Sequence, residues 1–247
     1  IAPHAYPLES GILYERSQEQ AFSGVSTYLL SGFDRVWVAD RLATECSWER
    51  ISDVSTGAPR IVFFSIKGGV GRSTALAASA WTLARQGKKV LVLDLDLESP
   101  GLSSALLTDD RMPTFGITDW LVEDLVDNGA SLLNDIYATS DLPMAGQIYL
   151  VPAHGRSPGE YVAKLGRVWM PKYTQEMKTE VWSSRLNRMV NDLEKMIHPD
   201  VILIDSRAGI DEVAAACVTE LGAYTVLMFA IQGKQTWTGY RALIAHW

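Results

Sequence analysis

Cysteine is almost absent from this sequence, with only Cys46 and Cys217 among its 247 residues. The two lie far apart and form no C-x-x-C pattern, so the sequence indicates neither a disulfide framework nor a structural zinc site. Its four histidines likewise show no metal-ligand spacing. These shortages argue against a small domain stapled by disulfides or zinc, and they leave the hydrophobic core as the source of stability.

Positive charge is also in short supply, since 22 Lys and Arg face 29 Asp and Glu and give a net charge of −7. This balance argues against a bulk electrostatic affinity for nucleic acid or for an anionic membrane. No apolar run reaches the roughly 20 residues that a transmembrane helix needs, and no signal-peptide pattern is visible. We therefore expect a soluble, cytoplasmic protein.

What the sequence does have is apolar residues, at 47% of the chain, which is enough to build one large α/β domain. Residues 1–59 are predicted to form an N-terminal extension, with a helix over residues 19–30, a strand over 36–39 and a linker over 52–59. Residues 60–247 are predicted to form the main domain.

Strand and helix patterns alternate along this main domain. Continuous apolar strands are predicted at residues 61–64, 90–93, 148–151, 201–204 and 225–229, and an amphipathic helix is predicted over residues 176–197. Strands that are apolar on both sides are typical of a sheet covered by helices on both faces. The fold class is therefore α/β, with a doubly wound, mostly parallel sheet. Because the sequence stops at Trp247 inside a helical pattern, we expect the domain to continue beyond it.

A glycine-rich segment, SIKGGVGRST over residues 65–74, connects the first of these strands to a helix. Its glycines let backbone amides surround an anion, and the N-terminus of the helix adds its dipole. Ser73 is placed to offer a hydroxyl ligand to Mg²⁺. The usual pattern G-x-x-x-x-G-K-[ST] is broken twice, by Ile66 in place of the first glycine and by Arg72 in place of the lysine. A tight connection alone would also use glycine, but the strand, helix and hydroxyl together favour a phosphate-binding loop.

Carboxylates follow two of the predicted strands. Asp94 and Asp96 form a D-x-D motif after one strand, and Asp205 closes another. An isolated Asp in such a place would be read as a loop or helix cap. The carboxyl ends of parallel strands open onto one crevice, so three such residues predict an acidic site beside the phosphate loop, where they can hold Mg²⁺ or orient water.

These segments resemble a known family. The motif KGGVGRST over residues 67–74 is similar to the deviant Walker A motif, KGGxGK[ST], of the ParA/MinD/ArsA-like ATPases, which belong to the SIMIBI class of P-loop NTPases. The arginine makes it similar to the group described as KGGVGR-motif variants. DLDLESPGLS over 94–103 resembles the family's switch I, and DSRAG over 205–209 resembles its Walker B and switch II. The resemblance covers residues 60–247 and does not extend to residues 1–59.

The resemblance implies bound ATP and Mg²⁺ and a nucleotide-dependent homodimer. It implies catalytic roles for Asp96, which would activate water, and for Lys67, the signature lysine that reaches phosphates across the dimer interface. Ser73, Asp94 and Asp205 would lie on the metal side. The implied nucleotide-binding residues are Lys67, Gly68, Gly69, Val70, Gly71, Arg72, Ser73 and Thr74.

The function that these features favour is an ATP-binding switch whose nucleotide-controlled dimerisation regulates an unidentified protein partner. The alternative is a nucleotide-binding scaffold subunit of a larger assembly with little or no hydrolysis, because an arginine cannot occupy the same space as the usual lysine. A DNA-partition ATPase is disfavoured by the acidic balance. Kinase chemistry on the same loop lacks an acceptor-site motif.

Overall fold

The computed structural model describes residues 26–34, 36–40, 48, 50–142, 145–173 and 179–247. The chain divides into two compact units, residues 1–43 and residues 44–247, and each is considered by itself. The predicted fold class concerns the second unit, which carries the phosphate loop.

The described part of the first unit is a β-hairpin. Strand β1 (Ser26–Leu29) pairs antiparallel with β2 (Trp37–Asp40). Both strands are rich in aromatic and β-branched residues, which favour extended backbone. The strand predicted over residues 36–39 is therefore confirmed with a shift of one residue. The helix predicted over residues 19–30 is wrong at residues 26–29, and residues 19–25 lie outside the described part.

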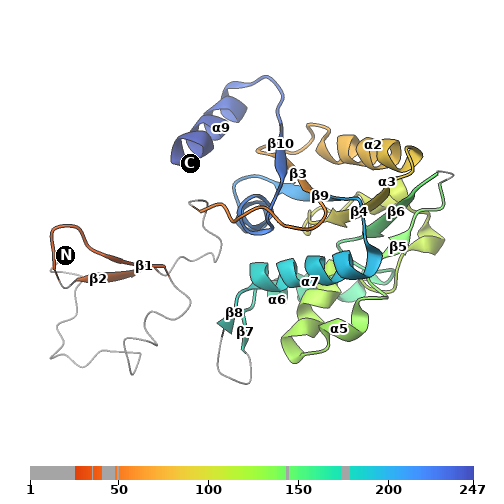
Figure 1. The fold of residues 1–247 in the computed structure, drawn as a ribbon, viewed down its shortest axis with the longest axis horizontal. Helices are drawn as coiled ribbons and strands as arrows, with labels where there is room; N and C mark the ends of the chain where they lie inside the picture. Colours follow the sequence, from red (N-terminus) through yellow and green to blue (C-terminus); the bar gives the residue numbers. More distant parts are fainter. Residues whose placement is uncertain (1–25, 35, 41–47, 49, 143–144, 174–178) are drawn as a thin grey trace. The chain divides into compact units, whose positions relative to one another are not determined.

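The second unit is built on a six-stranded sheet in the order β10-β3-β9-β4-β6-β5 (Figure 1). Every neighbouring pair is parallel except β5 with β6, which confirms the mostly parallel α/β prediction. The five predicted strands all form, and β9 runs four residues longer than predicted. The strands are β3 (Arg60–Ser65), β4 (Lys89–Asp94), β5 (Ala138–Thr139), β6 (Gln147–Val151), β9 (Val201–Ala208) and β10 (Thr225–Phe229).

Helices cover both faces of this sheet. On one face, α2 (Arg72–Arg85) and α3 (Ser103–Leu106) pack against buried residues of β3 and β4, including Phe63 and Val92. On the other face, the alternate residues of the same strands, such as Phe64 and Leu93, pack in one core with residues of the remaining helices. Those elements include α4 (Ile117–Glu123), α6 (Tyr161–Val168), α7 (Trp182–Ile197), α8 (Glu212–Ala215) and α9 (Lys234–His246).

Helix α7 buries the apolar face that its sequence periodicity predicts. Its predicted apolar residues, from Trp182 through Leu186 and Met189 to Ile197, are all buried in this core. The helix begins at Trp182 rather than residue 176, because Thr179–Glu180 form a short strand, β8, paired with β7 (Lys172–Tyr173). None of the helices in the described part of the chain has the length and apolarity needed to cross a membrane.

Candidate functional site

The glycine-rich loop joins β3 to α2, as predicted. Gly69 and Gly71 have φ angles of 72° and 84°, a region that L side chains rarely adopt, so glycine is required at both turns. Gly71 precedes α2 and has no side chain with which to cap it, which leaves the N–H groups of the first turn available to an anion. The loop forms one wall of a cavity of about 370 Å³. Its lining residues are Ser65, Gly68, Gly69, Val70, Gly71, Arg72, Ser73, Thr74, Asp96, Ser99, Arg207 and Ala208.

Arg72, the residue that replaces the usual lysine, is directed toward the ends of the strands. Its side chain is only 6% exposed. Its Nε donates to Oδ1 of Asp205 at 2.6 Å, Nη2 donates to Oδ2 of Asp96 at 2.9 Å, and Nη1 donates to Oγ of Ser65 at 3.2 Å. Burial by itself would lower the pKa of Arg72, but the charges and hydrogen bonds of Asp205 and Asp96 outweigh it and raise the pKa. We call Arg72, Asp96, Asp205 and the neighbouring Asp94 the Arg72 cluster.

Asp205 connects this cluster to the first turn of α2. Burial raises the pKa of Asp205, and the charge of Arg72 and a hydrogen bond with Ser73 oppose that rise. The predicted metal-side hydroxyl and carboxylate are thus adjacent. Both supply hard oxygen atoms, which are the donors that Mg²⁺ prefers.

Asp94 is the register partner of Asp205 on the neighbouring strand β4 and is fully buried. Its carboxylate accepts N–H bonds from Asp96 at 3.3 Å and from Leu102 at 3.2 Å. Burial, together with the charge of Asp205, raises the pKa of Asp94 to about 7. Asp94 is not among the residues that line the cavity, so of the predicted acids Asp96 is the one that borders it.

Magnesium fits this donor set better than a metal that needs a complete protein cage. Among the described residues, no group of three or more His, Cys, Asp or Glu side chains could hold a metal ion. Mg²⁺ keeps several waters and is usually bound through one or two carboxylates together with substrate phosphates. Ser73 and Asp205 therefore suffice only if phosphate and water complete the coordination.

Lys67 is set apart from the acids. Its Nζ donates to Oε1 of Gln235 at 2.6 Å, which links the start of the loop to the first turn of α9. Lys67 is exposed and is not among the residues that line the cavity. The structure thus brings Arg72, Asp96 and Asp205 together but does not bring Lys67 to them.

The sequence interpretation missed a second arginine of the cavity, Arg207. Its Nη1 and Nη2 contact the two carboxylate oxygens of Glu98 at 2.7 and 2.5 Å, and its Nε lies 3.3 Å from Oδ2 of Asp211. This bidentate ion pair joins the segment after β4 to the end of β9. The signal was available, because Glu98 and Arg207 stand in the same strand-end motifs as Asp94 and Asp205.

Comparison with known proteins connects this geometry to a family. Residues 61–221 match the family model described as the CobQ/CobB/MinD/ParA nucleotide binding domain. This match includes the loop, both D-x-D carboxylates, Asp205 and Arg207.

Solved structures share the fold at low sequence identity. The septum site-determining protein MinD complexed with Mg-ADP from Pyrococcus horikoshii is 23% identical, with a TM-score of 0.54, over 76% of this chain and 65% of that one. Cobyrinic acid a,c-diamide synthase from Mycobacterium smegmatis, with bound ATP analog and magnesium, is 20% identical, with a TM-score of 0.51, over 76% and 66%.

One curated relative extends the similarity to sequence. The putative septum site-determining protein MinD of Emiliania huxleyi is 30% identical over 155 residues, which are 62% of this chain and 45% of that protein. The chain therefore spans less than half the length of this relative.

Proposed function

Because the chain belongs to the CobQ/CobB/MinD/ParA nucleotide-binding family, we propose that its P-loop domain is a Mg²⁺-dependent ATP switch whose dimerisation controls a partner protein. The observation that supports this most directly is the cavity, in which the glycine loop and the start of α2 face Asp96 and lie next to the Ser73–Asp205 pair. We also propose a cytoplasmic location, which the shortage of cysteine supports.

In this proposal the residues of the loop, from Lys67 to Thr74, bind the phosphates. Backbone N–H groups at Gly68–Gly71 and at the N-terminus of α2 would donate hydrogen bonds to the phosphate oxygens. Arg72 lines the cavity and assists, because its guanidinium offsets part of the negative charge of two carboxylates that would otherwise repel the phosphates. Both relatives whose solved structures are described above hold magnesium together with a nucleotide or its analog.

The acids divide the remaining work. Ser73 and Asp205 would hold Mg²⁺, with Asp94 behind them, and the bound metal would offset charge on the phosphate oxygens. Asp96 borders the cavity, so its free carboxylate oxygen would accept a hydrogen bond from the attacking water and orient it.

The test of this site is equilibrium binding of ATP and GTP with and without Mg²⁺. We expect ATP to bind, with an affinity that increases when Mg²⁺ is added. Ser73→Ala should remove the Mg²⁺-dependent part, whereas Ser79→Ala, on the same helix but bonded to the carbonyl of Ala75, should not. Absence of Mg²⁺-dependent binding would refute the proposal, and a preference for GTP would change only the base.

Dimerisation is a separate step, and Lys67 is its proposed residue. Lys67 is exposed and its one described hydrogen bond is to Gln235, so it is free to leave this neutral partner for a phosphate on a second subunit. Lys67→Ala should spare ADP binding and reduce ATP-induced dimerisation, measured by light scattering. Lys88→Ala removes an exposed lysine at the other end of α2 and serves as the control. If Lys67→Ala dimerises as the wild type does, the role across the interface is wrong.

A scaffold with little hydrolysis is the second candidate, and the ion pairs of Arg72 favour it. Arg72 occupies oxygen atoms of both Asp205 and Asp96, the two carboxylates that hydrolysis would use. Turnover separates the two candidates, and it is measured by phosphate release from the monomeric protein and from the dimer that ATP induces. A protein that binds Mg·ATP yet releases no phosphate in either state is the scaffold.

A further inference from the structure

The phosphate cavity has two cationic side chains among its lining residues, Arg72 and Arg207. Each is engaged by carboxylates: Arg72 by Asp205 and Asp96, and Arg207 by Glu98 and Asp211. These contacts use the paired edges of each guanidinium fork, so a nucleotide that enters this cavity gains a bidentate contact with a guanidinium only if one of the ion pairs rearranges.

The two arginines differ in how firmly they are held. The side chains of Arg72 and Asp205 are 6% and 2% exposed, and breaking a pair buried to this degree leaves an uncompensated charge in the interior. The side chains of Arg207 and Glu98 are 33% and 49% exposed. Water screens such a pair and solvates both ends when it opens, so it contributes little to stability. Arg207 is thus the arginine that can leave its carboxylate.

The backbone around Arg207 does not need to move for this exchange. Strand β9 continues through Ala208, and the N–H of Gly209 donates to the carbonyl of Ser65 at 2.9 Å. Asp211 can remain in place as the cap of α8, because its Oδ1 accepts a hydrogen bond from the N–H of Ala214 at 2.9 Å. The exchange is therefore assigned to a rotation of the Arg207 side chain.

We propose that Arg207 is a phosphate-binding residue of this cavity, held by Glu98 in the absence of nucleotide and transferred to phosphate oxygens when nucleotide binds. The exchange suits a guanidinium, because its planar fork binds carboxylate and phosphate oxygens in the same bidentate way. Glu98 is not a lining residue, so its position holds the arginine at the edge of the cavity without placing a carboxylate in it. This inference rests on the proposed nucleotide site.

A double-mutant cycle on Arg207 and Glu98 tests the exchange, with Mg·ATP affinity measured by calorimetry on the full chain. Arg207→Ala should weaken binding about 10-fold or more, the value of a lost charge-assisted contact. Arg207→Lys keeps the charge but not the fork and should recover part of that loss. Glu98→Gln frees the arginine and should tighten binding a few-fold.

The double variant Arg207→Ala/Glu98→Gln decides whether Glu98 acts through Arg207. If Glu98 acts by holding Arg207, Glu98→Gln should have no effect in the Arg207→Ala background. If Glu98→Gln tightens binding equally in both backgrounds, Glu98 acts only as a nearby negative charge and the exchange is wrong. Lys195→Ala, which removes one positive charge from a surface pair with Asp192, should leave affinity unchanged.

The outcome also separates this inference from the proposed function. If the wild type binds Mg·ATP and Arg207→Ala, shown to be folded by circular dichroism, binds it equally well, then the role of Arg207 is wrong and the nucleotide site stands. If the wild type binds no nucleotide, both fall together.

Discussion

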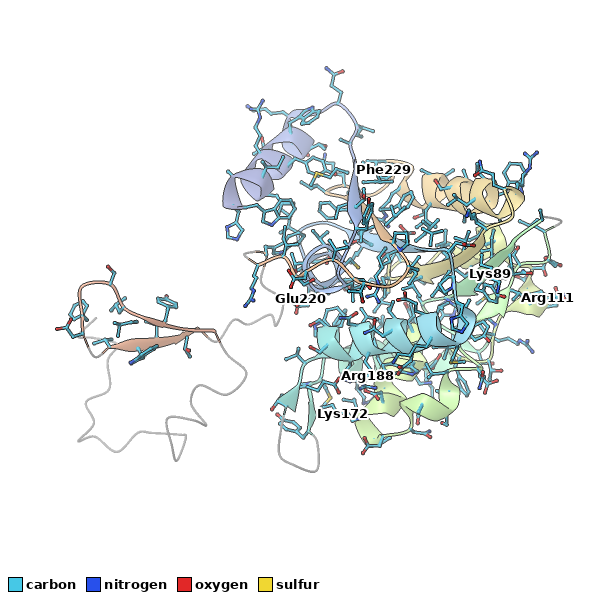
Figure 2. All side chains as sticks on the ribbon, viewed as in Figure 1. Lys89, Arg111, Lys172, Arg188, Glu220 and Phe229 are labelled. Atoms are coloured by element: carbon cyan, nitrogen blue, oxygen red, sulfur yellow. The ribbon has the colours of Figure 1, made fainter. Side chains whose placement is uncertain are left out.

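Two clusters of charged side chains, each centred on a buried residue, lie in the described part of the second unit, and they differ in their balance of charge. In the Arg72 cluster one cation faces three carboxylates. In the second cluster, which we call the Asp124 cluster, the carboxylate of Asp124 is surrounded by Lys172, Arg185 and Arg188 at 3.2, 2.9 and 2.8 Å. Figure 2 labels Lys172 and Arg188 near one another, in the part of the second unit where Figure 1 labels β7, β8 and α7.

The charges of the Asp124 cluster balance. Three cations face Asp124 and two further acids, since Lys172 also contacts Asp127 and Arg188 also contacts Glu180. Burial would raise the pKa of Asp124, but hydrogen bonds from Arg188 and Arg185 outweigh it and lower the pKa. A cluster that satisfies its own charges has no need of a ligand, and we interpret it as a tie between α7, the β7–β8 pair and the end of α4.

The Arg72 cluster does not balance, and the pKa of Asp94 is raised to about 7 as a result of burial and of the charge of Asp205. This acidic excess beside the glycine-rich loop would be offset by the Mg²⁺ that we propose arrives with the nucleotide. The comparison teaches that burial of charge does not by itself mark a site, whereas burial of unbalanced charge beside a cavity makes those residues candidates for one.

The largest expected effect comes from removing an acid of the unbalanced cluster that borders the cavity. Asp96→Ala should leave Mg·ATP binding largely intact and lower hydrolysis by roughly 10²–10⁴-fold, because a group that positions water is lost. Phosphate release measured under saturating ATP checks this. Asp110→Ala, an exposed acid outside the cavity, is the control. Turnover like that of the wild type in Asp96→Ala would remove Asp96 from the mechanism.

Removing the acid of the balanced cluster should act on stability and not on chemistry. Asp124→Ala leaves the fully buried Arg185 without its carboxylate, and breaking a buried pair in this way costs about 3–5 kcal/mol in the free energy of unfolding. Urea unfolding measures the loss. Asp127→Ala removes an acid that is 75% exposed and should cost less than about 1 kcal/mol. Equal losses in the two variants would contradict the central place of Asp124.

Arg72→Ala sharpens the comparison, because it makes the unbalanced cluster more acidic still. We expect ATP and ADP binding to weaken together by about 10-fold, since the phosphates then meet two carboxylates that nothing neutralises. Calorimetry with both nucleotides checks this.

Two further variants interpret that result. Arg72→Lys restores the common motif and should retain binding. Arg85→Ala, at the far end of the same helix, should bind both nucleotides as the wild type does. An Arg72→Ala protein that loses ATP binding alone would show that Arg72 responds to the terminal phosphate.

The smallest effect is the pH dependence that Asp124 gives to folding. Its pKa in the folded protein lies below the ordinary value of 3.8, so its contribution is complete above that value and is lost as the pH falls through the folded pKa. The difference in free energy of unfolding between the wild type and Asp124→Asn should therefore shrink below pH 4. Urea titrations at pH 7, 5, 4 and 3 measure it, and a difference that is constant across this range would contradict the assignment.

Much of the main domain could be predicted from local pattern. Continuous apolar runs gave the five strands because a strand covered on both faces must be apolar throughout, and α7 followed from its 3.6-residue period. The helix predicted over residues 19–30 was wrong at residues 26–29, since a short segment with Tyr28 and Leu29 suits either structure and its pairing with β2 decides.

The residues of the candidate site could be singled out from the sequence, but their contacts could not. The glycines, Ser73 and the strand-end acids can be recognised from their spacing in the sequence, and most of them line the cavity. The partners of Arg72 depend on the lengths of side chains from β3, β4 and β9, which come together only in the folded sheet. Arg207 with Glu98 and Asp124 with Arg185 are likewise pairs separated by many residues, and no periodicity encodes them.

The backbone at the end of β9 is held by the pairing of Ala208 with Ser65, by the hydrogen bond of Gly209 and by the cap of α8. This has a kinetic consequence. Because this wall of the cavity is held by hydrogen bonds, we expect that it need not close over a ligand, a motion that takes microseconds or longer. What remains to adjust is the rotation of side chains, which takes picoseconds to nanoseconds at exposed positions. The association rate of nucleotide should therefore be governed by diffusion and by the local electric field. The residence time should depend on the strength of the contacts in the bound state.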